Sequence, residues 1–342
     1  MEVSKHDKVC IAVPVYNGAK TLSTTLQSLV DQDYKNFEIF ICDNSSTDGT
    51  DKIIAEYEQK YPQLISHIVN PVVLNGEANW LYMLSNLPGG ANYIALFHAD
   101  DIYEPTIISE QVAVLKATGA GAAFTVANLI DERGNNINRQ MKFTPFLPAD
   151  FEIKDVYGFD EIYISILKHH NYIKTPSAFF PFETLTKQVP LFKKEFKSSA
   201  DLDLWLRIAK TNGISIINKP LLRYRISATQ GSQVLSKGRT HLADFFTVMD
   251  SHLTENLRRH ENAKWYEAMR AMNYIICSYH LIRLNNSLEA LQMLKQALNA
   301  KHTRYIFKIN GGYKQYAFGW LMYLVLKLKF ERFFNRYVVL DM

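Results

Sequence analysis

Residues 9–18, VCIAVPVYNG, are the first indication of the architecture, because a seven-residue apolar run passes directly into a turn there. The unbroken, β-branched run Val9–Val15 is typical of a strand that is covered on both faces. After the turn, apolar residues recur at positions i, i+4, i+7 and i+8, namely Leu22, Leu26, Leu29 and Val30. That spacing predicts a helix with one apolar face, so the chain begins as a strand–helix unit.

The same alternation continues beyond this unit. We expect a helix at Asp51–Lys60 and further strands at Phe37–Cys42, Ile65–Val69 and Tyr93–Phe97. Polar residues gather directly after the strands, as in DNSSTDGT at residues 43–50. Since the carboxyl ends of parallel strands meet at one edge of a sheet, the sequence predicts a parallel α/β sheet with its functional site at that edge.

The second half of the chain has a different spacing. From His241 to Phe334 the apolar positions recur at helical intervals, and Asn286 with Glu289 three residues later marks the start of a helix. A chain of 342 residues also exceeds the usual domain size of about 150 residues. We therefore predict an α/β domain over residues 1–231 and a mainly helical domain over residues 232–342.

Composition narrows the class of protein. Apolar residues make up 47% of the chain and charged residues 21%, which excludes an extended disordered protein. The net charge of +4 is too weak to indicate a nucleic-acid partner. The three cysteines form no CxxC pair, which argues against a disulfide framework or a zinc site. Because the N-terminus is charged and no run reaches about 20 apolar residues, we expect a cytoplasmic protein.

Acidic residues follow two of the predicted strands. Asp43 stands where the second strand stops, and its carboxylate can accept a hydrogen bond from a base N–H while Tyr16 faces the same ring. Asp100 and Asp101 follow the fourth strand. Two adjacent carboxylates repel each other unless a cation lies between them and a ligand, so the pair predicts a site for Mg²⁺ or Mn²⁺. The alternative is that these residues are ordinary loop carboxylates or helix caps.

A series of short blocks in a fixed order carries a family resemblance. The blocks are VPVYN (13–17), LQSLVDQDY (26–34), FEI (37–39), DNSSTDGT (43–50), NGEAN (75–79), ADDIYEP (99–105) and DLDLWLR (201–207). Over residues 7–226 the chain resembles the family 2 glycosyltransferases, inverting enzymes of the GT-A fold that use nucleotide-sugars. The resemblance implies a mainly parallel central sheet flanked by helices, and the helical C-terminal region lies outside it.

The resemblance also assigns roles to nucleotide-binding residues. Pro14 and Tyr16 would border the base, and Asp43 would accept the ring N–H of uracil or thymine. Asn79 would lie beside the ribose or the diphosphate. Asp100, which matches the metal-binding aspartate of the family's DxD motif, completes the predicted nucleotide site.

The chain departs from the DxD motif at its first position. His98 replaces the first aspartate there. This change removes a ribose contact that the family assigns to that aspartate, although an imidazole can still donate a hydrogen bond to a ribose hydroxyl. His98 is therefore a candidate contact to the diphosphate or acceptor, and a second role as a metal ligand is the less favoured alternative.

Catalysis is assigned by the resemblance to Asp201, which matches the family's general base, although Ala200 replaces the acidic residue that usually precedes it. A sugar hydroxyl is a poor nucleophile, so a carboxylate must remove its proton as the bond to phosphate breaks. Trp205 follows at i+4 and would either face the same cleft, as a contact to the diphosphate or acceptor, or pack in the core. Arg225 would contact the diphosphate or lie exposed on an edge strand.

We therefore expect an inverting, metal-dependent glycosyltransferase of bacterial polysaccharide biosynthesis that moves a sugar from a nucleotide-sugar to a glycan or lipid-linked acceptor. UDP is the favoured nucleotide and dTDP stays open. The alternative is a glycosyltransferase-like binding or scaffold subunit that has lost activity, since His98 and Ala200 depart from the family pattern.

The C-terminal tail has an unusual charge pattern. The stretch Tyr316–Leu326 carries no charge, whereas residues from 301 onward hold eight Lys and Arg against two Asp and Glu. An aromatic, basic, amphipathic helix of this kind can lie in a membrane surface, which would place the protein peripherally on the inner face of the cytoplasmic membrane. The alternative is an ordinary docking helix.

Overall fold

The structure is a computed structural model that describes residues 7–137, 147–148, 150–227, 238–309 and 311–330. The chain divides into two compact units. The first comprises Met1–Ile162, Asn171–Lys193 and Asp203–Ser227, and the second comprises Tyr163–His170, Lys194–Leu202 and Ala228–Met342. The predicted domain boundary between residues 231 and 232 lies outside the described residues. Two short segments from within the predicted α/β domain belong to the second unit.

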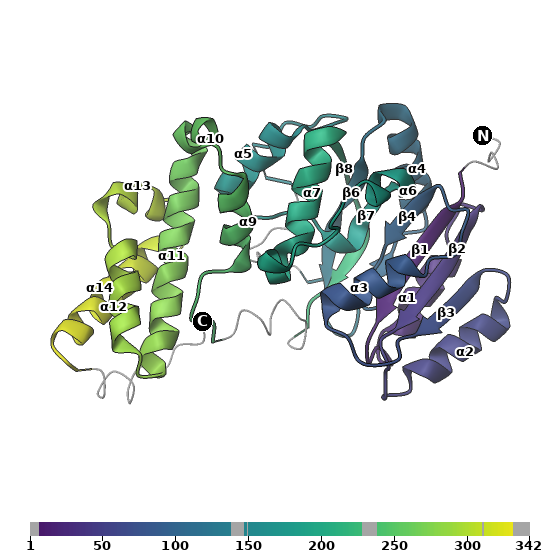
Figure 1. Cartoon of the computed structure of the whole chain (residues 1–342), viewed down its shortest axis with the longest axis horizontal. Coiled ribbons are helices and arrows are strands. Elements are labelled where there is room, and N and C mark those ends of the chain that lie inside the picture. Colours follow the sequence, from purple (N-terminus) through teal and green to yellow (C-terminus); the bar gives the residue numbers. More distant parts are fainter. Residues whose placement is uncertain (1–6, 138–146, 149, 228–237, 310, 331–342) are drawn as a thin grey trace. The chain divides into compact units, whose positions relative to one another are not determined.

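A sheet forms the centre of the first unit, and its described strands have the order β3-β2-β1-β4-β7-β6-β8-β5. Figure 1 labels β1–β4 and β6–β8. The strands are β1 (Val9–Val15), β2 (Phe37–Asp43), β3 (Ile65–Val69), β4 (Tyr93–Leu96), β5 (Ile102–Tyr103), β6 (Ala122–Ile130), β7 (Ala178–Pro181) and β8 (Ile214–Arg225). β1 to β4 are mutually parallel, and so are β6 and β8, whereas β7 and β5 are antiparallel to their neighbours. β7 is antiparallel to both β4 and β6, so β6 has the same direction as β4. The carboxyl ends of β1–β4, β6 and β8 therefore lie at one edge of the sheet.

Helices cover both faces of this sheet. In the first unit they are α1 (Leu22–Val30), α2 (Thr50–Lys60), α3 (Gly76–Ser85), α4 (Ile107–Thr118), α6 (Phe182–Thr186) and most of α7 (Ala200–Thr211). Most of α5 (Phe159–His169) belongs to the second unit. Alternate residues of β1, such as Ile11 and Val13, share a buried cluster with Leu26 of α1. On the other face, the Cys42 thiol of β2 donates to Asn79 Oδ1 of α3 (3.5 Å). α1 and α3 therefore enclose the sheet from opposite sides.

The predicted elements of the first unit agree with this architecture. Val9–Val15 and Ile65–Val69 are the observed strands, and the other two predicted strands each differ from the structure by one residue. The predicted helix after β1 is α1. The expectation of a mostly parallel sheet flanked by helices and followed by a helical region is confirmed.

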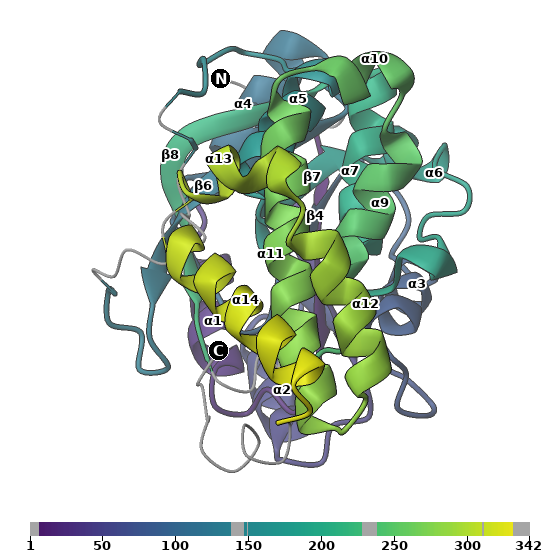
Figure 2. The ribbon, with the colours of Figure 1, turned by 90° about the vertical axis from the view of Figure 1, so that its left-hand side faces the viewer.

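Helices dominate the second unit. They are α9 (Asp244–His252), α10 (Glu255–Arg259), α11 (Asn262–Arg283), α12 (Ser287–Ala297), α13 (Thr303–Ile306) and α14 (Gly312–Lys327). Figure 2 shows α14 and α12 in front of the long α11, and buried residues of all three, such as Ile275, Leu294 and Met322, form one core. The predicted helix start at Asn286 is confirmed, because its side chain accepts the Glu289 N–H and caps α12.

The three cysteines are free thiols that lie in the core. Burial raises the pKa of the Cys42 thiol to about 12 and also raises the pKa values of Cys10 and Cys277. Since the thiolate is the reactive form, these thiols are unreactive as nucleophiles at neutral pH.

None of the described helices combines the length and the apolar character that crossing a bilayer requires.

Candidate active site

Hydrogen bonds join two loops at the carboxyl edge of the sheet. After β1, Asn17 donates its backbone N–H to Ser46 Oγ (2.8 Å), and Asn17 Oδ1 accepts the Thr47 N–H (2.9 Å). Asn17 adopts a left-handed conformation (φ 49°), which asparagine tolerates better than most residues. These bonds hold the turn that carries Tyr16 against the loop that follows Asp43.

Asp43 is the last residue of β2, and its side chain is almost completely buried. Its Oδ1 accepts hydrogen bonds from the backbone N–H of Ser46 (3.1 Å) and from the Ser46 hydroxyl (2.5 Å). Val15 pairs with Asp43 in the parallel register, so the half-exposed Tyr16 lies one residue beyond that pair. The structure thus brings the predicted base-binding residues to one place and fixes the direction of the carboxylate.

Pro14 is also at this edge, opposite Cys42 in the β1–β2 register. A proline has no backbone N–H, so it cannot donate a hydrogen bond to a strand on each side of it. β1 pairs with β4 only as far as Ala12, so no β4 residue pairs with Pro14. The half-buried ring is therefore compatible with the strand and stands among the predicted base-binding residues.

Asn79 belongs to a buried network that the sequence did not predict. Its Oδ1 accepts a hydrogen bond from Asn70 Nδ2 (2.7 Å), and Asn70 Nδ2 also donates to Asn44 Oδ1 (2.7 Å). The Asn70 backbone N–H donates to Asp43 O (2.8 Å). Asn70 thus ties α3 to the loop after β2. The predicted contact of Asn79 with ribose or diphosphate stays a prediction.

The turn after β4 is held by two hydroxyl groups that the sequence analysis missed. Thr25 Oγ1 of α1 donates to the carbonyls of Ala99 (3.0 Å) and Asp101 (2.7 Å). The hydroxyl of the buried Tyr103 accepts the His98 N–H (2.6 Å) and donates to His98 O (3.3 Å). Tyr103 lies within the block ADDIYEP, and Thr25 is a polar residue on the buried side of α1.

The side chains of His98, Asp100 and Asp101 gather in this turn, and their potential ligand atoms all lie within 4.8 Å of one another. Asp101 is fully buried: its Oδ1 accepts the Arg225 backbone N–H (2.7 Å), and its Oδ2 has no hydrogen-bond partner. Burial and the nearby charge of Asp100 raise the pKa of Asp101 well above its ordinary value. A bound cation would favour the ionised carboxylate.

This donor set fits the predicted ion. Two carboxylates are the ligands that Mg²⁺ and Mn²⁺ prefer, and an imidazole is compatible with Mn²⁺. The unsatisfied Asp101 Oδ2 provides a buried oxygen for such an ion. His98, for which the sequence favoured a diphosphate or acceptor contact over a role as metal ligand, thus lies within the same group. Its ring also meets the Trp80 ring edge-on, with 5.7 Å between centroids.

Arg225 at the end of β8 requires a correction. Its side chain is 5% exposed; Nε donates to Asp100 O (2.6 Å), and Nη1 donates to Asp131 O and Glu132 O (both 3.0 Å). β8 is not an edge strand, because β5 pairs with it on the outer side. The alternative of an exposed arginine on an edge strand is therefore wrong. Its guanidinium holds the turns after β4 and β6, which makes Arg225 a positioning residue, and the contact with a diphosphate stays a prediction.

Arg225→Gln should lower Mn²⁺ affinity by about 10–100-fold, because residues that orient metal ligands typically have effects of this size. The carbonyls left without donors should also lower the free energy of unfolding by about 2–4 kcal/mol. Titration with Mn²⁺, followed by electron paramagnetic resonance, measures the first effect and urea unfolding the second.

The matched control for this substitution is Arg223→Gln on the same strand. Arg223 is 43% exposed and pairs with Glu104 on the surface (Nε to Oε1, 2.6 Å). The substitution Arg223→Gln should leave the Mn²⁺ affinity unchanged. Equal Mn²⁺ affinity in both variants and the wild type would remove the positioning role from Arg225.

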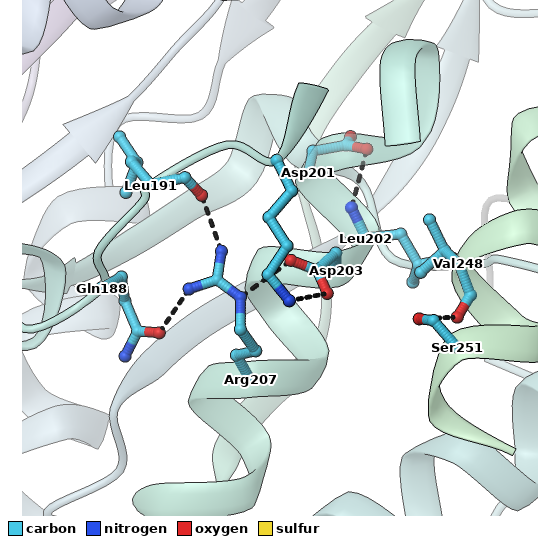
Figure 3. Close-up of polar contacts among 9 residues, drawn as sticks. Gln188, Leu191, Asp201, Leu202, Asp203, Arg207, Val248 and Ser251 are labelled. Carbon is cyan, nitrogen blue, oxygen red and sulfur yellow. Dashed lines mark hydrogen bonds and ion pairs between the residues drawn. The ribbon is translucent and has the colours of Figure 1, made fainter. Parts of the chain in front are cut away.

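An ion-pair network surrounds one of the two carboxylates of α7 (Figure 3). Asp203 is fully buried, and its carboxylate pairs with Arg207 Nε (2.8 Å) and with Lys193 Nζ (3.6 Å). Arg207 further donates to Gln188 Oε1 (2.8 Å) and Leu191 O (2.7 Å). Buried charges are stable only when paired in this way, so Asp203 has a structural role.

Asp201 has a different environment, although it lies only two residues earlier. It occupies the first turn of α7 and is half-buried, and its Oδ1 accepts the Leu202 N–H (2.7 Å). The division between the two units passes directly after Leu202, so Asp201 belongs to the second unit. Of the two α7 carboxylates, Asp201 is the one that is partly exposed.

Trp205 also requires a correction. The side chain is completely buried, its ring meets the Phe124 ring at 5.1 Å between centroids, and its Nε1–H donates to Thr175 Oγ1 (3.4 Å). Both the ring and the N–H of Trp205 thus have partners within the core. The expected contact with diphosphate or acceptor is therefore replaced by the core alternative: Trp205 anchors α7 to the sheet.

Comparison with known proteins gives one family. A family model described as "Glycosyl transferase family 2" matches residues 10–185. An uncharacterized glycosyltransferase from Rickettsia conorii is 27% identical over 262 residues, a region that covers 73% of this chain and 39% of that relative. The chain therefore spans well under half the length of this relative.

Solved structures show the same fold. Residues 1–349 of Staphylococcus aureus TarS in complex with UDP-GlcNAc match with a TM-score of 0.58 at 15% identity, over 98% of this chain and 95% of that chain. A mannosyltransferase from Pyrobaculum calidifontis, PcManGT, in complex with GDP-Man and Mn²⁺ matches with a TM-score of 0.52 at 16% identity, over 96% and 87%. The predicted GT-A type fold is thereby confirmed, and the likeness extends over the helical region.

Proposed function

The chain belongs to glycosyltransferase family 2, and from this membership we propose that it transfers a sugar from a nucleotide-sugar donor to a hydroxyl group of an acceptor. One observation carries the proposal: the carboxylate of Asp43, which ends β2, and the acidic group of His98, Asp100 and Asp101, which follows β4, lie at the same edge of the sheet. A nucleoside diphosphate needs both an acceptor for its base N–H and a counter-charge for its phosphates.

We favour UDP as the nucleotide. Uracil offers one ring N–H between two carbonyls, and the carboxylate of Asp43, oriented by Ser46, can accept that hydrogen bond. Thymine offers the same N–H, so dTDP remains the second candidate. The TarS complexes with UDP and UDP-GlcNAc support a uridine nucleotide, whereas the PcManGT complex contains GDP-Man.

His98, Asp100 and Asp101 would hold the divalent cation, for which the Mn²⁺ in PcManGT is additional support. Once bound, Mg²⁺ or Mn²⁺ stabilises the negative charge of the departing diphosphate. Thr25, Tyr103 and Arg225 keep the ligand-bearing turn in place through its backbone. We expect this rigidity to limit the reorganisation needed during transfer.

Asp201 is the proposed general base. Its carboxylate would take the proton of the acceptor hydroxyl while the oxygen attacks C1 of the sugar and the C1–O bond to the diphosphate breaks. Attack from the face opposite the leaving group inverts the anomeric centre. We propose a glycan or a lipid-linked sugar as the acceptor, and the product as part of a bacterial surface polysaccharide.

A thermal-shift panel of UDP-, dTDP- and GDP-sugars, each with and without Mn²⁺, tests the proposed function. A ligand that binds only the folded state raises the melting temperature. We expect the largest shift with a UDP-sugar and Mn²⁺ together. If no nucleotide-sugar shifts the melting temperature, the proposed function is wrong.

Asp43→Ala should weaken UDP binding by about 10–100-fold, because the variant loses a hydrogen bond to a charged acceptor. Calorimetry measures the affinity. A UDP analogue methylated at the ring nitrogen should bind the wild type as weakly as UDP binds the variant, and the variant should not distinguish the two ligands. Asp51→Ala, which removes an exposed carboxylate from the first turn of α2, is the control. Equal UDP affinity in Asp43→Ala and wild type would refute the role.

A further inference from the structure

Helix α14 carries an exposed apolar face. The large apolar side chains on it and at its C-cap are between 44% and 62% exposed, namely Tyr313, Trp320, Leu321, Leu324 and the C-cap residue Leu328. With residues about 100° apart around a helix, these positions and the exposed Ala317 fall within an arc of about 100°. We call this surface the α14 face. It is a continuous stripe, unlike apolar residues that are scattered singly over a surface.

The opposite side of α14 is buried in the second unit. Tyr316, Gly319, Met322 and Leu326 pack in the core that α14 shares with α11 and α12, as Figure 2 shows for the helices. The Gly319 position allows a close approach, because an added Cβ would lie 3.0 Å from the Ile275 side chain. The helix therefore already has its partner on one side, and the α14 face is a second apolar surface.

Lysines border the α14 face on both sides. Lys314 and Lys327 lie next to the arc at opposite margins, and Lys329 follows at the end of the helix; all three are exposed. From residue 301 to residue 330 the sequence holds six Lys and Arg and no Asp or Glu. An apolar stripe between lysines is the arrangement in which long basic side chains reach lipid headgroups while the stripe enters the acyl boundary.

We propose that the α14 face docks on an anionic lipid surface. A second copy of this chain would have to bring the same lysines close together, whereas negatively charged headgroups neutralise them. Trp320 and Tyr313 are residue types that favour the membrane–water interface. With 16 residues, α14 is about 24 Å long, which suits a helix that lies along the surface. The contact goes beyond the proposed transfer reaction and does not depend on it.

Co-sedimentation of the full chain with vesicles tests the proposal. Vesicles of equal parts phosphatidylglycerol and phosphatidylcholine should bind the protein, and vesicles of phosphatidylcholine alone should not. Added salt should weaken the binding because it screens the lysines. The variant Lys314→Gln, Lys327→Gln, Lys329→Gln should bind the anionic vesicles about 100-fold more weakly, or about fivefold for each lysine.

A second variant separates the apolar contribution. Leu321→Gln with Leu324→Gln should weaken vesicle binding at least about tenfold while circular dichroism and the melting temperature stay unchanged, because both side chains are exposed. The control Ile153→Gln with Val189→Gln removes two exposed apolar side chains from the first unit and should bind as the wild type does.

Two results would overturn the proposal. The first is a wild-type chain that stays in the supernatant with anionic vesicles, or a Leu321/Leu324 variant that binds them as well as the wild type. The second is a dimer in analytical ultracentrifugation that the Leu321/Leu324 variant abolishes, since a second copy would then cover the α14 face.

Discussion

Asp201→Asn lowers the rate of sugar transfer by about 10²–10⁴-fold and leaves donor affinity within about twofold of the wild type. Asparagine has the shape of aspartate but cannot accept a proton at neutral pH, so only the step that needs a base is affected. The proposed donor contacts are made by Asp43 and the group around Asp100, which the substitution does not touch. Turnover under saturating donor and calorimetric affinity for UDP measure the two quantities separately.

A matched control accounts for the position of Asp201 in the first turn of a helix. Carboxylates there interact favourably with the helix dipole, so their loss alone affects stability. Asp160→Asn removes an exposed carboxylate from the first turn of α5 and should leave turnover unchanged. Wild-type turnover in Asp201→Asn would exclude Asp201 as the base. A chain that binds UDP-sugars but transfers none even as wild type would instead support the scaffold alternative.

Asp100→Asn removes most of the Mn²⁺ binding and lowers turnover at least about 10²-fold. The acidic group then keeps one carboxylate, Asp101, and the leaving diphosphate loses its counter-charge. Because the variant loses turnover by binding Mn²⁺ more weakly, excess Mn²⁺ should restore part of the turnover. Paramagnetic resonance of free Mn²⁺ and turnover across a range of Mn²⁺ concentrations provide the measurement.

The two catalytic variants serve as controls for each other. Excess Mn²⁺ should not restore turnover to Asp201→Asn, since a missing base is not a matter of metal occupancy. Asp51→Asn controls for the general loss of an exposed carboxylate. If Asp100→Asn binds Mn²⁺ with wild-type affinity, the ion does not bind at this turn and the assignment of the acidic group is wrong.

Much of the first unit could be predicted because its strands are buried on both faces. The run Val9–Val15 is apolar throughout, and such a run has few alternatives once a turn and an amphipathic helix follow it. The strands β6 and β7 were not predicted, since β7 pairs antiparallel with β4 after a long excursion of the chain. Pairings of that kind depend on tertiary packing, which a local pattern does not contain.

The sequence predicted the side chains that would contact a ligand. It did not predict the side chains that hydrogen-bond to the backbone of the site. Asp43, Asp100 and Asp101 stand at strand ends, so topology alone brings them to one edge. The partners of Arg225 are three backbone carbonyls, and every residue has such a group. No sequence pattern therefore distinguishes a buried arginine that donates to backbone carbonyls from an arginine that binds a phosphate.

The burial of the native thiols makes this chain convenient for site-directed labelling. All three cysteines lie in the core with raised pKa values, so a maleimide reagent meets no competing group on the surface. A single cysteine introduced at the exposed Ala317 can carry a fluorophore or spin probe without prior removal of native residues. Such a probe reports the polarity around one helix in an otherwise unmodified protein.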